Sequence, residues 1–441
     1  MTPAQGWVLF SIALVLAALA CAWPYFVEVL SVAILGLWFV ANALFRAWLV
    51  LMGSRAIGMG ETPRKQDRDD LPLYSILVPL YREANVVPRL IRALVALDYP
   101  RDRLDIKLVI EDDDLETNAA VADASLDRRF HVIRVPAAQP RTKPKACNYA
   151  LRFVRGEFTV IYDAEDRPEP DQLRKAVAAF RDYSDEVACL QARLNFFNST
   201  ECWLAKMFTL DYALWFDLML PGLDRAKILM PLGGTSNHFR TSALRAVHGW
   251  DPFNVTEDAD LGIRLARLGL RVRTLDSTTF EEAATRFETW LKQRTRWLKG
   301  YMQTWLVHMR SPRALLKNAG PSGFLAFQLF VGGTFVSALL NPILWLIFLV
   351  SEFFGWSAFA VVDARLSIAS LIIGNGLFAS LAMLAPLRRG WQHLSIHGLL
   401  APVYWLLISI AGYRALFQLF RCASHWEKTP HGESAMFESS P

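Results

Sequence analysis

Cysteine is scarce, and neither sign of charge dominates. The five cysteines, at positions 21, 147, 189, 202 and 422, show no paired spacing. The sequence therefore indicates neither a zinc site nor a disulfide framework, and cysteines in ordinary packing roles suit a cytosolic location for the polar part. Lys and Arg number 47 against 42 Asp and Glu, a net charge of +5. So mild and dispersed an excess does not indicate a nucleic-acid-binding protein.

The composition fits neither a soluble domain nor a pure membrane bundle. The chain is 53% hydrophobic, with 15 Trp and 28 Phe, which is too apolar for a soluble domain of this size. Charged residues make up 20%, which is too polar for a pure membrane bundle. Residues 7–52 are nearly continuous apolar sequence, broken at 21–25 and at Glu28. We predict two membrane helices, about 7–22 and 29–51, within an N-terminal membrane region of residues 1–52.

The first apolar run has a cleaved signal peptide as its alternative interpretation. Nothing before Trp7 is positively charged, and a second long apolar run follows at once, so this alternative fits poorly. Basic residues gather at the far end of the second helix and place that end in the cytosol. They are Arg46, Arg55, Arg64, Lys65 and Arg68.

The middle of the chain has an α/β pattern. After a polar linker at 60–72, short β-branched runs alternate with stretches of helical periodicity. We predict strands at 74–80, 106–110, 131–135 and 158–163, and helices at 86–97 and 146–154. This alternation predicts a mostly parallel sheet with helices on both faces, in a catalytic-type domain of residues 53–285. Residues 286–320 are expected to form amphipathic helices at the membrane interface.

The last third, residues 321–421, turns apolar again. Runs at 324–350, 366–387 and 396–420 predict about three membrane helices, and Arg388 and Arg389 mark a cytosolic loop. The first run is either one long span or a span interrupted at Asn341-Pro342. Three spans would leave the C-terminus outside, whereas two passes within the first run would change the count. Residues 422–441 are expected to be a polar tail.

The stretch Phe158–Asp166 organises the α/β block. A buried-type strand stops abruptly at three carboxylates, Asp163, Glu165 and Asp166. Ligands of open α/β sheets bind at the carboxyl ends of strands. Hard oxygen ligands suit Mg²⁺ or Mn²⁺, which usually keep waters and bind substrate phosphates. We interpret the stretch as a metal–diphosphate site; a solvated turn is the alternative.

Further polar clusters end the other predicted strands. Tyr81 and Glu83 follow the first strand, and Tyr81 can stack on a base. The acidic run 111–114, which contains Asp112, follows the second. Lys145 and Asn148 belong to a stretch that opens a helix, where free N–H groups and the helix dipole favour anions. Surface turns explain each cluster singly, but their common position at one sheet edge favours a site.

Two later motifs complete the pattern. Thr256-Glu257-Asp258 leads into a helix, and Thr256 is also a good N-cap. Residues 290–305 form an amphipathic, aromatic and basic helix that contains Gln293, Arg296 and Trp297. Its alternative interpretation is an interfacial membrane helix.

With these motifs together, the chain resembles membrane-embedded family 2 glycosyltransferases, such as bacterial cellulose, hyaluronan and poly-N-acetylglucosamine synthases. The resemblance runs from the first strand to Trp297. Asp163-Ala-Glu165 matches the family's metal-binding D-x-D motif, Thr256-Glu257-Asp258 its T-E-D motif, and Gln293 to Trp297 its Q-x-x-R-W motif. The resemblance implies a GT-A fold, a Rossmann-like cytosolic domain flanked by transmembrane helices.

The resemblance also implies a role for each matched residue. Asp258 is the expected general base, with Glu257 next in line, and Asp163 and Glu165 are the expected ligands of Mg²⁺ or Mn²⁺. The nucleotide sugar is expected at Tyr81, Glu83, Asp112, Lys145, Asn148 and Arg296. The acceptor is expected at Gln293, Trp297 and Ser236, the last within the stretch Gly233–Ser236.

Some features depart from the family pattern. The second D-x-D position is Glu165, followed by Asp166, so the metal ligand at this point is left open. The C-terminal nucleotide-sensing domain and gating loop of cellulose synthases are not recognisable, and the chain ends soon after Trp426-Glu-Lys-Thr-Pro-His431. These features more closely resemble exopolysaccharide-type bacterial relatives.

The expected function is inverting, metal-dependent and processive β-glycosyl transfer at the bacterial inner membrane. The donor is expected to be a UDP-hexose or a UDP-N-acetylhexosamine, and the acceptor a growing exopolysaccharide. A partner subunit or a second copy of the chain is a possible addition, and nucleic acid is not expected as a partner. The alternative is a single addition to a membrane lipid.

Overall fold

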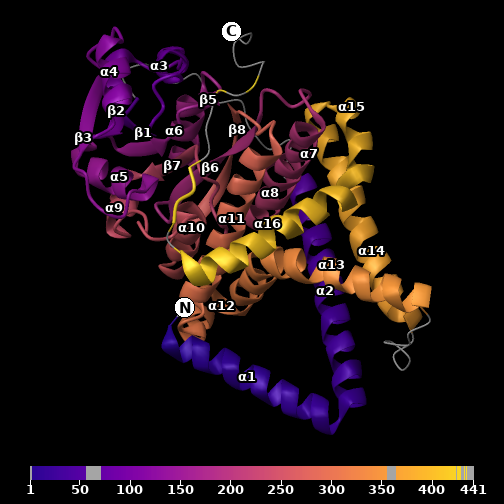
Figure 1. Ribbon diagram of the computed structural model, residues 1–441. Coiled ribbons are helices and arrows are strands. Elements are labelled where there is room, and N and C mark those ends of the chain that lie inside the picture. The colour runs from indigo at the N-terminus through magenta and orange to yellow at the C-terminus, as the bar shows by residue number, and fades with distance from the viewer. Residues whose placement is uncertain are drawn as a thin grey trace.

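A computed structural model describes residues 2–55, 71–354, 364–423 and 425–428, together with 432 and 434. Most of the predicted linker at 60–72 lies outside these residues. The described chain has a mixed α/β body and a set of long helices that extend from it (Figure 1).

The body is built on one eight-stranded sheet with the order β3-β2-β1-β4-β7-β6-β8-β5. Its strands are β1 (Tyr74–Leu80), β2 (Leu104–Glu111), β3 (Phe130–Val135), β4 (Phe158–Ile161), β5 (Arg167–Pro168), β6 (Val187–Phe196), β7 (Asn237–Arg240) and β8 (Arg271–Glu281). The four strands predicted from the sequence form the half β3-β2-β1-β4, in which every pairing is parallel.

The other half of the sheet was not predicted strand by strand. β7 pairs antiparallel with both β4 and β6, while β6 and β8 are parallel. The short β5 closes this edge antiparallel to β8. The sheet is therefore mixed, and its parallel half carries the predicted strand-end clusters.

Side-chain alternation divides the core between the two faces of the sheet, as expected for strands covered on both sides. Ile76 and Val78 of β1 belong to one buried cluster, and Leu77 between them belongs to the other. The first cluster lies against α3 (Val87–Val95) and α6 (Gln172–Asp182). The prediction of helices on both faces is confirmed.

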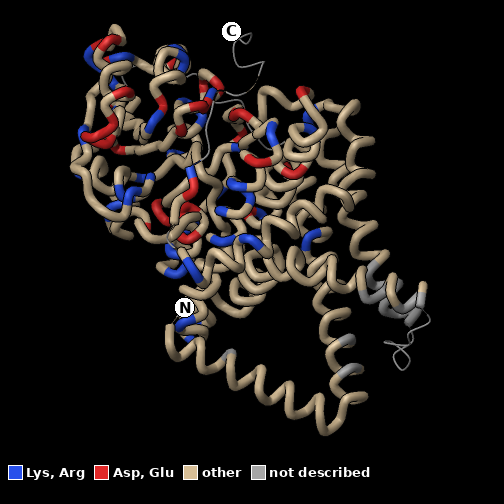
Figure 2. Tube along the Cα trace, in the orientation of Figure 1, with Lys and Arg blue, Asp and Glu red and all other residues tan. Residues whose placement is uncertain are grey.

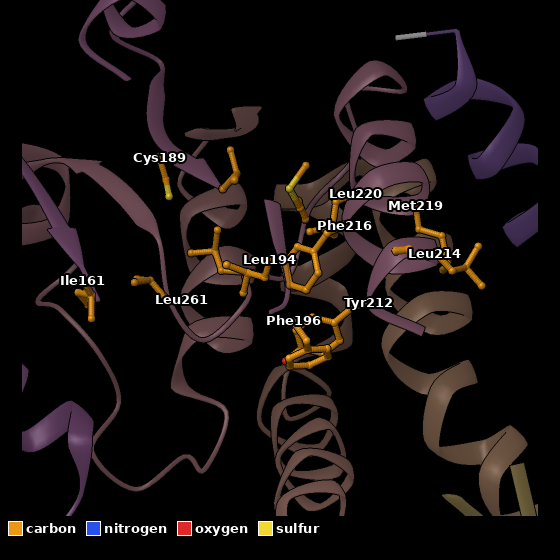
Figure 3. Packing of buried hydrophobic residues seen from close by; sticks show 14 of the residues in the cluster. Ile161, Cys189, Leu194, Phe196, Tyr212, Leu214, Phe216, Met219, Leu220 and Leu261 are labelled. Atoms are coloured by element: carbon orange, nitrogen blue, oxygen red, sulfur yellow. The ribbon is translucent and has the colours of Figure 1, made fainter. Parts of the chain in front are cut away.

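The second cluster joins the sheet to a helical layer (Figure 3). This layer includes α5 (Lys143–Ala150), α7 (Trp203–Tyr212), the π-helix η4 (Ala213–Met219), α8 (Leu220–Arg225) and α10 (Glu257–Arg267). Phe196 of β6 packs on Tyr212 with ring centroids 4.3 Å apart. The remaining short elements of the body are η2 (Arg101–Arg103), α4 (Leu115–Asp123), η3 (Leu151–Phe153) and α9 (Thr241–Ala246).

Within the described residues, four helical segments are long and apolar enough to cross a membrane: Pro3–Ala22, Pro24–Ser54, Pro312–Leu346 and Gln392–Arg421. The first two are α1 (Pro3–Ala22) and α2 (Pro24–Ser54), the predicted hairpin. Figure 2 shows that Lys, Arg, Asp and Glu gather in the body, whereas α1 and most of α2 are free of them. These helices indicate membrane association.

The C-terminal helices follow α11 (Phe287–His308), which confirms the predicted amphipathic helix. They are α12 (Pro312–Phe327), η5 (Gln328–Gly332), α13 (Gly333–Phe354), α14 (Ala364–Leu384), η6 (Ala385–Arg389), α15 (Gln392–Ser395), η7 (Ile396–Leu400) and α16 (Ala401–Arg421). α13 runs through Pro342, so the chain is not interrupted there. The break lies earlier, at Gly320, whose φ of 72° and ψ of 172° are not helical.

The end of α2 is fixed to the body by close helix contact. A Cβ on Gly53 would lie 1.9 Å from the Leu218 carbonyl oxygen, and one on Gly222 would lie 2.1 Å from that of Leu49. Only glycine permits these two backbones to approach so closely. α2 is therefore both a candidate membrane span and a structural part of the body.

Candidate active site

A cavity of about 470 Å³ lies at the carboxyl ends of β1, β2 and β4. It continues between α11 and the helical layer and reaches side chains of α2, α13, α14 and α16. Nine of the thirteen predicted site residues line it: Tyr81, Glu83, Asp163, Glu165, Glu257, Asp258, Gln293, Arg296 and Trp297. The polar end of the cavity and the long apolar helices thus share one cavity.

The three acids after β4 do not face the same way. Asp166 is buried, and its Oδ2 accepts hydrogen bonds from the Asp163 N–H at 2.8 Å and from the Thr235 hydroxyl. Burial, together with the charges of Asp163 and Glu165, raises the pKa of Asp166 well above its usual value. Asp166 thus holds the turn from inside, whereas Asp163 and Glu165 line the cavity.

The two cavity-lining acids suit a cation that is shared with a phosphate ligand. Among the described residues, no group of three or more His, Cys, Asp or Glu side chains is close enough to hold a metal by itself. Mg²⁺, however, is usually bound by one or two carboxylates plus waters and substrate phosphates. The donor set of Asp163 and Glu165 fits that pattern.

Lys143, which the sequence reasoning passed over in favour of Lys145, belongs to this end of the cavity. Its ammonium group forms an ion pair with Asp163 and donates to the Gly234 carbonyl at 2.7 Å. Lys145 instead donates to both carboxylate oxygens of Glu111 at 2.8 Å. Both lysines stood in the motif Lys-Pro-Lys at the helix start, so the signal for Lys143 was present.

The other predicted residues outside the cavity lining make structural contacts or face solvent. Asn148 bonds both the N–H and the carbonyl of Trp250, at 2.9 and 2.7 Å. Ser236 is fully buried and its hydroxyl donates to Thr279 at 2.6 Å. Asp112 is exposed at the end of β2. Contacts of Asp112, Lys145, Asn148 and Ser236 with a donor or acceptor stay predictions.

The adjacent acids Glu257 and Asp258 lie in the first turn of α10. Burial raises the pKa of Glu257 to about 8, with a further contribution from the charge of Asp258. Burial also raises the pKa of Asp258 to about 6, opposed by the Ala259 N–H, which donates to its Oδ1 at 2.8 Å, and by Lys143. Burial therefore favours the protonated form of both carboxyl groups, and does so more strongly for Glu257.

The predicted N-cap is confirmed in position only. Thr256 precedes α10, but its hydroxyl is buried without a hydrogen-bond partner among the described residues. The Thr256 side chain instead packs on Gly300 of α11, where a Cβ would lie 2.3 Å from the threonine Oγ1. This contact fixes the acids of α10 against the helix that carries the second motif.

α11 presents three predicted residues to the cavity, because positions 293, 296 and 297 lie on one helix face. The Trp297 ring is stacked on Tyr212, with centroids 6.0 Å apart and planes 28° apart. Burial lowers the pKa of Arg296, while Glu257 and Asp163 oppose this shift. The guanidinium of Arg296 therefore lies within electrostatic reach of both groups of acids.

Two cavity residues come from the segment after α16, which the sequence interpretation treated only as a polar tail. Trp426 and Lys428 line the cavity, and the Arg296 guanidinium lies 4.7 Å from the Trp426 ring centroid. Figure 1 shows the tail running from the end of α16 past α10 toward the sheet. The only sequence signal was an aromatic residue and a cation just after the last apolar run.

The same segment is tied to the body by ion pairs. Lys428 forms an ion pair with Glu83 at 2.9 Å and donates to the Arg82 carbonyl at 2.9 Å. Glu427 accepts two hydrogen bonds from Arg414 of α16, at 2.7 and 2.8 Å. Residues 426–428 thus form part of the cavity wall on the side of Tyr81 and Glu83.

Comparison with known families agrees with this geometry. Residues 72–300, just over half of the chain, match the family described as "Glycosyltransferase like family 2". The chain belongs to that family. The matched range contains all thirteen predicted site residues, whereas the membrane helices and the tail lie outside it.

Several curated proteins are similar over this part of the glycosyltransferase. A "Probable glycosyltransferase YdaM" of Bacillus subtilis is 26% identical over 239 residues, which cover 54% of this chain and 57% of that protein. A "Probable glucomannan 4-beta-mannosyltransferase 1" of Arabidopsis thaliana is 29% identical, over 53% of this chain and 43% of that protein. A "Beta-monoglucosyldiacylglycerol synthase" of Trichormus variabilis is 27% identical, over 58% and 55%. The chain thus spans about half the length of these relatives.

The fold is shared with a solved structure. A mannosyltransferase from Pyrobaculum calidifontis, in complex with GDP-Man and Mn²⁺, superposes with a TM-score of 0.54 at 17% identity. The match covers 87% of this chain and 99% of that chain. It therefore includes both the mixed sheet and most of the helical part of this family 2 protein.

Proposed function

We propose that this protein is a metal-dependent glycosyltransferase that moves a sugar from a nucleoside diphosphate to an acceptor at the membrane, with inversion at the anomeric carbon. The observation that carries this proposal is the single cavity that joins the acids at the sheet edge to the membrane helices. A donor made in the cytosol and an acceptor held at the membrane can meet there. The proposed location is the bacterial inner membrane, with the α/β body in the cytosol.

On the donor side, Asp163 and Glu165 would hold a divalent cation, which when bound supplies positive charge to the leaving diphosphate. Arg296 and Lys143 add cationic groups at the same end of the cavity, and arginine suits bidentate phosphate contacts. The Pyrobaculum mannosyltransferase was solved in complex with GDP-Man and Mn²⁺, which supports such a ligand set. Tyr81 offers a ring for the base.

In the transfer step, Asp258 accepts the proton of the acceptor hydroxyl. The resulting oxygen nucleophile forms a bond to the anomeric carbon while the bond from that carbon to the diphosphate oxygen breaks. A single displacement of this kind converts an α-linked donor to a β-linked product. Trp297 offers an apolar face for the acceptor sugar, and the Gln293 amide lies one turn earlier on the same face.

We further propose that the transfer is repeated, so that a polysaccharide grows toward the membrane. The membrane part of the cavity is lined by aromatic rings, including Phe378, Tyr404 and Trp405, and by polar side chains such as Asn341 and Ser409. Sugar rings stack on such aromatic faces. The donor sugar is proposed to be a hexose or an N-acetylhexosamine.

A second candidate function is a single addition to a membrane lipid. It is favoured by Arg46, a cation on α2 that lines the membrane part of the cavity. The Trichormus relative, a beta-monoglucosyldiacylglycerol synthase, is by its name a synthase of a glucosylated lipid.

The length of the products decides between the two. Membranes containing the protein are incubated with labelled UDP-sugars or GDP-mannose and Mg²⁺ or Mn²⁺. Long chains beside unused primer at low turnover support repeated transfer. One lipid-extractable glycoside per acceptor supports the lipid alternative, and the absence of nucleoside diphosphate release with every donor contradicts glycosyl transfer altogether.

A further inference from the structure

Arg46 is a cation with only neutral partners. Its Nε donates to Asn42 Oδ1 and its Nη2 donates to Thr334 Oγ1, both at 3.1 Å. Its guanidinium lies 5.0 Å from the ring centroid of Phe378. Among the described residues, no carboxylate oxygen lies within 4.0 Å of its nitrogens. The positive charge is therefore not neutralised by an ion pair in the described chain.

Its position makes that charge costly unless it serves a ligand. Arg46 lies in α2, eight residues before the helix ends at Ser54, or about 12 Å along the axis. Charged groups inside membrane segments are expensive and usually face a polar cavity or a substrate path. Arg46 does line the cavity, and the end of α2 packs on the body at Gly53. Arg46 therefore lies in the part of α2 nearest the body, in the wall of the cavity.

The cavity places Arg46 beyond the expected base, on the membrane side. Tyr301, one helical turn after Trp297 on α11, also lines the cavity. Burial raises the pKa of Tyr301, the charge of Asp258 raises it further, and the charge of Arg46 lowers it. Tyr301 thus lies within electrostatic reach of both groups. Asp211, the cavity acid nearby, is paired with Arg294.

We propose that Arg46 binds the phosphate of a lipid-linked acceptor while the sugar of that acceptor lies against Trp297 and Asp258. A guanidinium suits phosphate because it can donate two parallel hydrogen bonds. The neighbouring helices α13, α14 and α16 provide apolar and aromatic surface for the start of the lipid chain. The acceptor of the first transfer is then an anionic lipid. This inference rests on the proposed glycosyl transfer, and names the acceptor class of the same cavity.

Binding of lipid probes tests the inference without a known donor. The full chain is purified in detergent, and binding of farnesyl phosphate is compared with binding of farnesol and with competition by inorganic phosphate. Wild-type protein is expected to prefer farnesyl phosphate. Arg46→Gln should lose about ten-fold to a hundred-fold of that preference, the range for a hydrogen bond to a charged group.

Two further variants test whether a loss of binding comes from the missing phosphate contact or from a defect in folding. Arg46→Lys keeps the charge and should retain part of the preference, which distinguishes binding from a folding defect. The matched control Arg421→Gln removes an exposed arginine at the end of another membrane helix, outside the cavity, and should bind like wild type.

The outcomes separate the possible explanations. Equal binding of farnesyl phosphate by wild type and Arg46→Gln overturns the proposal. Inorganic phosphate that competes as well as farnesyl phosphate also overturns it, because the lipid would then contribute nothing. If no donor is ever turned over, glycosyl transfer fails as a proposal, yet a phosphate preference that depends on Arg46 would still establish the lipid site.

Discussion

At the level of single residues, the neighbouring carboxyl groups of Glu257 and Asp258 share a buried environment that favours their protonated forms to different extents. Burial raises the pKa of both carboxyl groups, that of Glu257 to about 8 and that of Asp258 to about 6. Two adjacent acids in one pocket rarely ionise together, because the second charge is repelled by the first. The lower pKa of Asp258 supports the sequence prediction that Asp258 is the base, with Glu257 next in line.

The first prediction is that kcat/KM rises with pH and that this rise depends on Asp258. A general base acts in its deprotonated form, so kcat/KM should increase with pH through about 6, the raised pKa of Asp258. Asp258→Asn should lower turnover by about 10²–10⁴-fold and abolish this rise. The measurement is nucleoside diphosphate release against pH.

A matched control is Asp276→Asn, because Asp276 is an exposed carboxylate of β8 outside the cavity. It should leave both the rate and the pH profile unchanged. If Asp258→Asn turned over substrate at the wild-type rate, Asp258 would be only a structural residue in the first turn of α10. Glu257 would then be the next candidate for the base.

The second prediction concerns the divalent cation. EDTA should abolish transfer, and Mg²⁺ or Mn²⁺ should restore it, since Asp163 and Glu165 are the cavity acids suited to share a cation with a diphosphate. Asp163→Asn should weaken the metal dependence of donor binding while the protein still folds. Asp166→Asn is the informative comparison, because its buried carboxyl holds the turn and its loss should lower stability as well.

Transfer in EDTA at the full rate would rule out the metal role. A metal response unchanged by Asp163→Asn but lost on Glu165→Gln would move the main ligand to Glu165. These results are distinguished by measuring the affinity for the donor at increasing metal concentrations. Circular dichroism checks that each variant is folded.

Most of the site residues predicted from the sequence, nine of thirteen, line the cavity, but the patterns did not predict the direction in which each one points. Motif spacing was sufficient for Gln293, Arg296 and Trp297, because helix geometry places them on one face. It was insufficient for Lys143 and Lys145, which lie two residues apart in one helical turn and face different partners. Which of two neighbouring lysines reaches a site depends on the acids that tertiary folding brings near, and these have no local signature.

At the level of elements, the contact between α10 and α11 sets the geometry of the site. α10 carries the acid pair, and α11 carries Gln293 and Trp297, which are expected to hold the acceptor, together with Arg296, which is expected to contact the donor. Thr256, just before α10, packs on Gly300 of α11, where a Cβ has no room. A third prediction follows from this contact.

Gly300→Ala should destabilise the protein by about 1–3 kcal/mol, the usual cost of overpacking a core contact. It should also lower transfer more than donor binding, because α11 must move away from Glu257 and Asp258. Gly36→Ala is the matched control, since nothing lies within 4 Å of the Cβ that it adds to α2. Thermal unfolding in detergent and the transfer rate are the measurements; equal midpoints for Gly300→Ala and wild type would contradict the steric argument.

Elements with a strong local pattern were predicted well, and those defined by distant partners were not. β1 was predicted at its observed bounds, and the membrane hairpin and α11 were also recognised. The pairing of β7 between β4 and β6, and the return of residues 426–428 to the cavity, were missed. Both depend on contacts between segments far apart in the chain, and local hydrophobic periodicity does not predict such contacts.

At the level of the whole molecule, the charged body and the apolar helices are joined firmly at a few points. Besides the glycine contacts of α2, Arg389 of η6 donates to both carboxylate oxygens of Asp217 in η4, at 2.6 and 2.7 Å. α1, in contrast, extends away from the body (Figure 1). Membrane attachment therefore involves both helices that are integral to the body and one that is nearly independent of it.

The last prediction separates these two kinds of helix by deletion. None of the α1 side chains whose exposure is described is buried, and its described hydrogen bond to the rest of the chain runs from Gln5 Nε2 to the Leu306 carbonyl, at 2.7 Å. Removing residues 2–22 should therefore cost about 0.5–1.5 kcal/mol, the net value of one hydrogen bond, and should leave donor hydrolysis intact.

Removing residues 2–55 should have a far larger effect, because it also deletes Leu49 and Val50, which are 0% and 7% exposed within the main core cluster. Each such side chain contributes about 1.5–3 kcal/mol by its burial, and the close contacts at Gly53 and Gly222 are lost with them. This variant should fail to accumulate as folded protein. Equal unfolding midpoints for the two deletions would mean that α2 serves only as an anchor and does not build the cavity wall beside Arg46.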